Sequence, residues 1–219
     1  MKTRYGYRDA VSGFFEFPTD NARRILPSHL EPVELHHGTS IFSMTVFDFT
    51  ESMVGPYGEV VMSVIVSPLV KPGERLPKSA FYPYRVATTT RAAREHAIER
   101  WHLPHWMEDV EIHLRRDARS LTAKVTTRGA PALEFTVTAR TWQPAAHLYQ
   151  SFQRDHSGSY LASFVTDGEQ SEHEDEAGRI VLHDTAFNDG LAIAEVAQTP
   201  FREIWGRRGC QLFEPLLRL

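Results

Sequence analysis

The chain has 219 residues and a formal net charge of -4 at pH 7, with 42% hydrophobic and 24% charged residues. This balance is typical of a globular protein and excludes a largely disordered one. No run of lysine and arginine is long enough to follow a phosphate backbone, so we expect no nucleic-acid partner. No stretch approaches the roughly 20 apolar residues of a membrane span, and the amino terminus lacks the apolar core of a signal peptide. We therefore expect a cytoplasmic protein with no membrane partner.

The first predicted element is a short helix over Asn21 to Ile25, which ends before Pro27. A second helix is predicted from Thr90 to Trp101, with Thr90 as its N-cap. A third is predicted near Thr199 to Trp205, because Pro200 is favourable in a first helical turn. Alternation of apolar and polar residues predicts strands over Ile41 to Phe49, Glu59 to Val66, Val110 to Arg115, Ser120 to Thr127, Glu134 to Trp142, His147 to Gln153, Tyr160 to Val165 and Arg179 to Asp184.

The many short strands are separated by turn signals, which predicts an α+β fold that is predominantly antiparallel β. A curved sheet or β-barrel would be accompanied by a few short helices. The acidic stretch from Thr166 to Gly178 is predicted to be a solvated hairpin loop. The length fits one domain over residues 1–219, and the single cysteine, Cys210, excludes an intramolecular disulfide.

Three local patterns in the first half of the chain carry a resemblance to a known family. Phe14 and Glu16-Phe17-Pro18 precede Leu26-Pro27-Ser28-His29-Leu30-Glu31-Pro32, and Gly55-Pro56-Tyr57-Gly58-Glu59 leads into the apolar segment Val60 to Val66. The third pattern is Glu99-Arg100-Trp101-His102-Leu103-Pro104-His105-Trp106. In this order and spacing, the patterns resemble those of the acetoacetate decarboxylase family. The resemblance implies the curved-sheet or barrel fold of that family, and a homo-oligomer.

The family's reaction uses a lysine that condenses with a ketone, and the resemblance places His105 and Trp106 where the family has two successive lysines. An imidazole cannot form a stable iminium with a ketone, so covalent decarboxylation is not available at His105. A relocated amine at Lys71 or Lys78 stays open as a less favoured alternative. The resemblance also implies an arginine near Val11 to Phe14, where the nearest one is Arg8.

One acidic residue matches the family pattern. The resemblance places Glu59 where the family has a carboxylate that faces the reactive centre. Next to an apolar strand this carboxyl could be desolvated, which would raise its pKa into the range useful for proton transfer. The alternative is a glutamate at the edge of a strand that faces solvent. We expect His105 to exchange a proton with Glu59 as its partner, and Tyr57 to donate a hydrogen bond to a developing enolate oxygen.

The sequence is rich in histidine between residues 96 and 113, but it has no spacing typical of a metal site, so we expect no metal and no cofactor. His96 and His113 are predicted to lie at the surface or rim. Two functional hypotheses remain. One is an enzyme that acts on a small β-keto or polyketide-like carbonyl compound by non-covalent acid–base chemistry, as a lyase, dehydratase, cyclase or decarboxylase. The other is a non-catalytic barrel that binds a small molecule. In both, the cavity would be lined by Tyr57, Trp101, Trp106, Phe81 and Tyr84.

Overall fold

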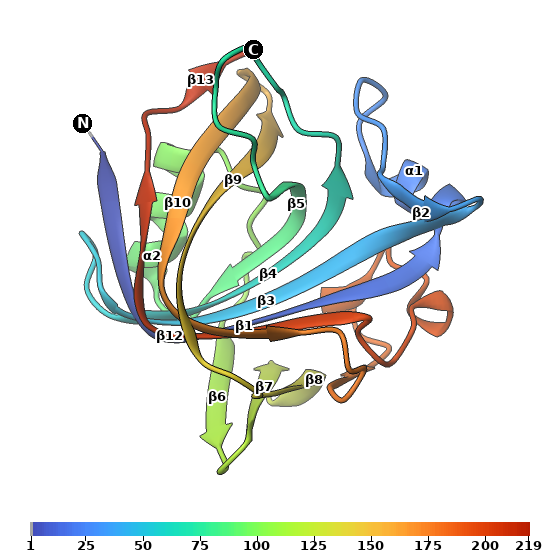
Figure 1. The fold of residues 1–219 in the computed structure, drawn as a ribbon, viewed down its shortest axis with the longest axis vertical. Helices are drawn as coiled ribbons and strands as arrows, with labels where there is room; N and C mark the ends of the chain where they lie inside the picture. Colours follow the sequence, from blue (N-terminus) through green and yellow to red (C-terminus); the bar gives the residue numbers. More distant parts are fainter. Residues whose placement is uncertain (1) are drawn as a thin grey trace.

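The computed structural model describes residues 2–219 and contains a closed barrel of seven strands (Figure 1). Around the barrel these strands are β1 (Thr3–Pro18), β12 (Arg202–Phe213), β10 (Gly158–His173), β9 (Gln143–Asp155), β5 (Ser79–Thr88), β4 (Tyr57–Val66) and β3 (Thr39–Glu51). The barrel closes because β1 pairs with both β12 and β3. All neighbours are antiparallel except β5 and β9. The predicted fold class is therefore confirmed.

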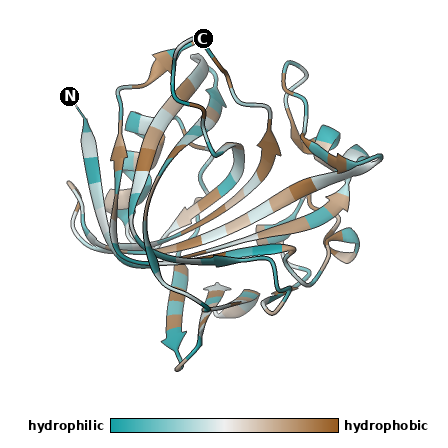
Figure 2. Cartoon of the chain, in the orientation of Figure 1, coloured by the Kyte–Doolittle hydropathy of each residue, from teal (hydrophilic) through white to brown (hydrophobic). Residues whose placement is uncertain are grey.

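Two short strands extend the barrel, and a second sheet covers part of its outer wall. Strand β2 (Glu34–His36) pairs with β3, and β13 (Leu217–Arg218) pairs with β10. The second sheet is antiparallel, in the order β11 (Arg179–Leu182), β8 (Ala130–Thr138), β7 (Ser120–Thr127) and β6 (Val110–Arg116). Figure 2 shows bands of hydrophobic and hydrophilic residues alternating along β6 and the long barrel strands.

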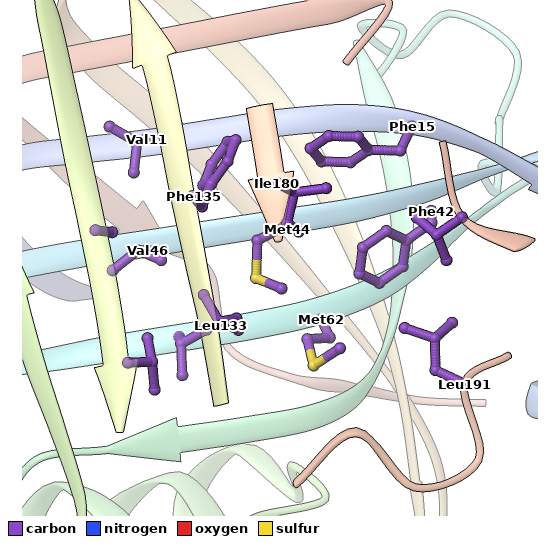
Figure 3. Packing of buried hydrophobic residues seen from close by; sticks show 14 of the residues in the cluster. Val11, Phe15, Phe42, Met44, Val46, Met62, Leu133, Phe135, Ile180 and Leu191 are labelled. Carbon is purple, nitrogen blue, oxygen red and sulfur yellow. The ribbon is translucent and has the colours of Figure 1, made fainter. Parts of the chain in front are cut away.

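The main hydrophobic core lies between this second sheet and the outer wall of the barrel. Figure 3 shows Phe15 and Met44 of the barrel wall facing Phe135 and Ile180 of the second sheet. Phe15 and Phe135 are fully buried, and their ring centroids are 5.8 Å apart in an edge-on arrangement. Side chains of β1, β3 and β4 therefore point alternately into this core and into the barrel, so these strands are buried on both faces.

Two α-helices interrupt the strands, at the two places where the clearest helix signals occur. Helix α1 (Thr19–Ile25) follows β1, and α2 (Arg91–Trp101) follows β5. The Thr90 hydroxyl accepts a hydrogen bond from the Ala93 N–H at 3.2 Å, which confirms the predicted N-cap. Helix α2 ends at His102, which has a left-handed backbone with φ 53°. Two 3₁₀ turns, η1 (Ala186–Asn188) and η2 (Ile193–Glu195), lie between β11 and β12. Within residues 2–219, no helix is long and apolar enough to cross a bilayer.

Three predictions about elements are wrong. The helix expected near Thr199 to Trp205 is instead the start of β12, because Arg202 onward pairs with β1. The loop expected from Thr166 to Gly178 is strand as far as His173, because this segment pairs with β9 and β12. Its acidic residues Glu169 and Glu172 form ion pairs with Arg207 and Lys78. The strand expected over Glu134 to Trp142 ends at Thr138.

A buried carboxylate fastens the barrel to the second sheet. Glu203 on β12 is fully buried and accepts hydrogen bonds from the backbone N–H groups of Thr138 at 2.6 Å and Gly178 at 2.8 Å. A third N–H, from Ala177, lies 3.1 Å away. Because the charge is met by three backbone donors, Glu203 can stay buried as a structural link.

We predict that Phe135→Ala lowers the free energy of unfolding by about 3–5 kcal/mol, since it removes a buried ring and leaves a cavity between the two layers. Urea denaturation followed by circular dichroism measures this change. The control is Val181→Ala on the neighbouring strand β11, where the side chain is exposed, and it should change stability by less than about 0.5 kcal/mol. A loss below about 1 kcal/mol for Phe135→Ala would contradict the placement of the core.

Candidate functional site

The barrel interior contains a cavity of about 150 Å³, to which all seven barrel strands and α2 contribute side chains. This is about the volume of the apolar cavity that takes up benzene in an engineered protein. Its wall includes a set of phenylalanine and tryptophan side chains, namely Phe14, Phe47, Phe49, Phe81, Trp101, Phe164 and Phe213. The titratable residues of the wall are Tyr5, Tyr7, Tyr57, Glu59, His96 and Tyr149. The site is therefore a compact pocket whose surface is largely apolar but which also contains hydroxyl and amide side chains.

Glu59 is the one acidic residue that lines this cavity in the described part of the chain. It lies on β4 between Thr88 of β5 and Phe47 of β3. No hydrogen bond or ion pair of its carboxyl is found within residues 2–219. Because burial disfavours the charged form, the pKa of Glu59 is raised to about 8. Its carboxyl faces the cavity, so the solvent-facing alternative does not hold.

A hydrogen-bonded chain connects the cavity wall to α2. The Trp101 indole N–H donates to the Tyr5 hydroxyl oxygen at 2.6 Å, and that oxygen lies 2.6 Å from His96 Nε2. Burial raises the pKa of Tyr5 to about 12 and lowers the pKa of His96, so both groups are neutral at pH 7. The Tyr5 O–H then donates to the imidazole, since Tyr5 already accepts the indole proton.

Sequence reasoning placed His96 at the surface or rim and missed its place in the cavity wall. Ala93, Ala97 and Trp101 are the buried residues of α2, four positions apart. His96 is three residues after Ala93, which places it on the same side of the helix. That spacing was the available signal, but the helix is otherwise so polar that its buried face is not evident.

The structure separates the predicted wall residues into two groups. Tyr57, Trp101 and Phe81 line the cavity together with Glu59. Tyr57 packs on Phe49 with ring centroids 5.0 Å apart, and burial holds its pKa far above the usual range. Tyr84 and Trp106 do not line the cavity but pack against the main core outside the barrel wall. For Tyr84 the reason is the pleat of β5, which turns alternate side chains outward. Trp106 lies after α2, in the segment that bonds to Val86 of β5.

His105 lies beside β5 and outside the residues that line the cavity. Its Nδ1 donates to the Trp106 carbonyl oxygen at 2.5 Å, and its Nε2 lies 3.1 Å from the Thr88 hydroxyl. Burial lowers the pKa of His105 to about 4. Its imidazole is therefore neutral at pH 7, and both ring nitrogens are engaged. The structure does not bring His105 and Glu59 onto one cavity wall.

No lysine or arginine lines the cavity among residues 2–219. Lys78 forms an ion pair with Glu172, and Lys71 is an exposed loop residue. Arg8 is an exposed residue that pairs with Asp48 at 2.5 Å. Residues 2–219 also contain no group of three or more histidine, cysteine or acidic side chains placed to hold a metal ion. The titratable side chains of the cavity wall are therefore carboxyl, hydroxyl and imidazole groups.

The barrel is closed, mostly antiparallel and built around a cavity, an architecture that can enclose a small molecule. The sequence model of the acetoacetate decarboxylase (ADC) family matches residues 2–189. The chain belongs to this family, and the resemblance found in its sequence is confirmed.

Solved structures of the family share the fold at low sequence identity. An acetoacetate decarboxylase is 13% identical, with a TM-score of 0.67, and the match covers 100% of this chain and 89% of that one. The enduracididine biosynthesis enzyme MppR, complexed with pyruvate, is 13% identical with a TM-score of 0.63 over 98% of this chain and 90% of that one. The acetoacetate decarboxylase of Legionella pneumophila is 15% identical with a TM-score of 0.60, covering 96% and 84%. Among curated protein sequences, none matches the chain significantly.

We predict that Glu59→Gln stabilises the protein at high pH and not at low pH. The folded-state pKa of Glu59 is raised above its unfolded value, so the folded state favours the protonated carboxyl. The wild-type protein therefore loses stability relative to the variant by about 1.4 kcal/mol per pH unit above the unfolded pKa, and the loss levels off above pH 8. Urea denaturation of both proteins at pH 5 and pH 8.5 measures the difference.

The matched control is Glu16→Gln, an exposed position on β1, whose stability should follow the wild-type dependence on pH. If Glu59→Gln tracks wild type at both pH values, the carboxyl is not desolvated in the folded protein.

Proposed function

We propose that the protein acts on a small β-keto or polyketide-like carbonyl compound in the barrel cavity by non-covalent acid–base chemistry. The observation that carries this proposal is the unpartnered carboxyl of Glu59 in a cavity that no described lysine or arginine lines. A general base is most effective when its pKa lies near the working pH, and burial moves Glu59 into that range. Membership of the acetoacetate decarboxylase family supports a carbonyl substrate. The structurally similar MppR is complexed with pyruvate, a keto acid, but no described lysine or arginine lines the cavity of this chain to pair with such a carboxylate.

The proposed step is a proton transfer from the carbon next to a carbonyl group. The Glu59 carboxylate takes that proton, and the electron pair of the broken C–H bond moves to the carbonyl oxygen to give an enolate. The Tyr57 hydroxyl donates a hydrogen bond to that oxygen. Glu59 then returns its proton to a carbon atom or to a departing hydroxyl group. This sequence accounts for enolisation, dehydration or ring closure without a covalent intermediate.

The second proton-transfer unit in this proposal is the Tyr5–His96 pair. Glu59 influences the pKa of both Tyr5 and Tyr57, as expected for groups that share one enclosed space. Tyr5 can pass its proton along its 2.6 Å contact to His96 in one concerted step, as Tyr5 receives another proton from the ligand, so that no tyrosinate forms. His105 has both ring nitrogens engaged away from the cavity, so we assign the imidazole role to His96.

The alternative is a barrel that binds a small molecule without transforming it. The observation that favours it is the aromatic wall, which would hold a flat apolar ligand without further chemistry. The two functions differ in what they require of Glu59. A binding protein needs the shape of that side chain, whereas an enzyme needs its proton.

We predict that Glu59→Gln lowers the rate of α-proton exchange by about 100- to 10,000-fold, because glutamine keeps the shape and loses the base. The measurement is NMR of a panel of ketones and β-keto esters in D₂O with catalytic amounts of protein. The wild-type rate should also rise with pH up to about 8 and then level off, following ionisation of Glu59.

Glu16→Gln serves as the surface control, and His105→Asn tests the sequence-based assignment and should leave the rate within about threefold of wild type. Unchanged exchange in Glu59→Gln for every accepted compound would reject the enzymatic proposal. Tight binding of those compounds without any exchange in the wild-type protein would favour the binding barrel.

A further inference from the structure

The charges around the cavity restrict what it can hold. Its wall has one carboxyl, Glu59, and one imidazole, His96, whose pKa is lowered by burial. Arg100 on α2 is exposed and does not line the cavity. Its guanidinium donates to the Thr3 hydroxyl at 2.6 Å and lies over the Trp101 ring. In the described chain, therefore, no side chain offers a positive charge inside the barrel.

A carboxylate ligand would be poorly accommodated in such a cavity. An anion that leaves water for an apolar space needs a cation or several hydrogen-bond donors to replace its hydration. Here it would share the enclosed space with Glu59, so a bound carboxylate would keep that carboxyl protonated and leave the site without its base. Free β-keto acids are carboxylates at neutral pH, so the wall disfavours them.

The polar part of the wall is instead neutral. Gln153 and Gln170 are each 3% exposed and line the cavity. The Gln153 amide uses one end to bond the Ser151 hydroxyl at 2.9 Å, and its Oε1 has no partner within residues 2–219. Gln170 Oε1 is also buried and without a partner there. Buried amides with unused bonding capacity suit neutral groups such as a hydroxyl, an amide or an ester.

We propose that the cavity selects uncharged carbonyl compounds of about the size of one six-membered ring and rejects free carboxylic acids. This rests on the proposed function for the identity of the ligand as a carbonyl compound. The size follows from the cavity of about 150 Å³, and the charge preference follows from Glu59 and the neutral amides. Decarboxylation of a free keto acid is then outside the range of this site, which leaves enolisation, dehydration and ring closure.

The test is calorimetric titration of the protein with benzamide and benzoate at pH 7. These probes share one ring and differ mainly in charge. Methyl acetoacetate and acetoacetate form a second pair on an aliphatic skeleton. We expect each neutral compound to bind at least about tenfold more tightly than its charged counterpart. Equal or tighter binding of benzoate or acetoacetate would overturn the proposal, as would failure of every probe to bind.

A positive charge introduced into the cavity wall tests the same argument, because it should favour the binding of a carboxylate. Gln170→Lys is expected to move the preference toward benzoate by at least about tenfold, whereas Glu16→Lys adds a cation on the outer surface and should leave the order unchanged. If the folded Gln170→Lys variant still prefers benzamide as strongly as wild type, the charge argument is wrong. If that variant does not fold, the wild-type comparison alone decides.

These outcomes are separate from those of the proton-exchange experiment. Benzamide and benzoate have no exchangeable α-proton, so their binding reports the cavity and not the chemistry. A preference for neutral probes combined with unaltered exchange in Glu59→Gln would reject the enzymatic function and keep the ligand class. No preference for neutral probes, combined with reduced exchange in Glu59→Gln, would keep the enzymatic function and reject the proposed ligand class.

Discussion

The pairing of β1 with two partners is the constraint on which the other features depend. Thr3–Pro18 bonds to β12 along one edge and to β3 along the other, which turns an open sheet into a barrel. Closure gives these strands an inner face and an outer face that are both shielded from water. The outer face packs under the second sheet, and the inner face surrounds the cavity. Without this closure Glu59 would be an ordinary solvated carboxylate.

The buried carboxyl connects the stability of the barrel with its proposed chemistry. Ionisation of a desolvated Glu59 without a partner destabilises the folded protein. The packing of Phe49 on Tyr57 and the core around Phe135 offset this loss of stability. The same desolvation gives a group that can exchange a proton near neutral pH. A hydrogen-bonded cation next to Glu59 would stabilise the protein and remove that property. Functional groups are commonly kept at such a cost in stability.

The sequence predicted the fold class and most of the strands with one exposed face. In such strands apolar and polar residues alternate with a period of two, because one face is buried and the other is solvated. Alternation did not reveal β1, which shows no clean period of two, although β3 and β4, also buried on both faces, were predicted. Glu59, Tyr57 and Trp101 were predicted for the wall, through the resemblance and through their aromatic character. His105 was placed there by correspondence with a lysine, but the direction of its side chain depends on the turn after His102, which local sequence does not specify.

The protonation state of Glu59 is the central claim, and it is measured most directly by ¹³C NMR. Protein labelled at glutamate side-chain carboxyl carbons is titrated from pH 4 to pH 10, and the Glu59 resonance is assigned by its absence from Glu59→Gln. The account predicts that this resonance titrates with a pKa near 8, well above the glutamates at the surface. A value at or below about 5 would contradict the account, because the carboxyl would then be a hydrated anion throughout the neutral range.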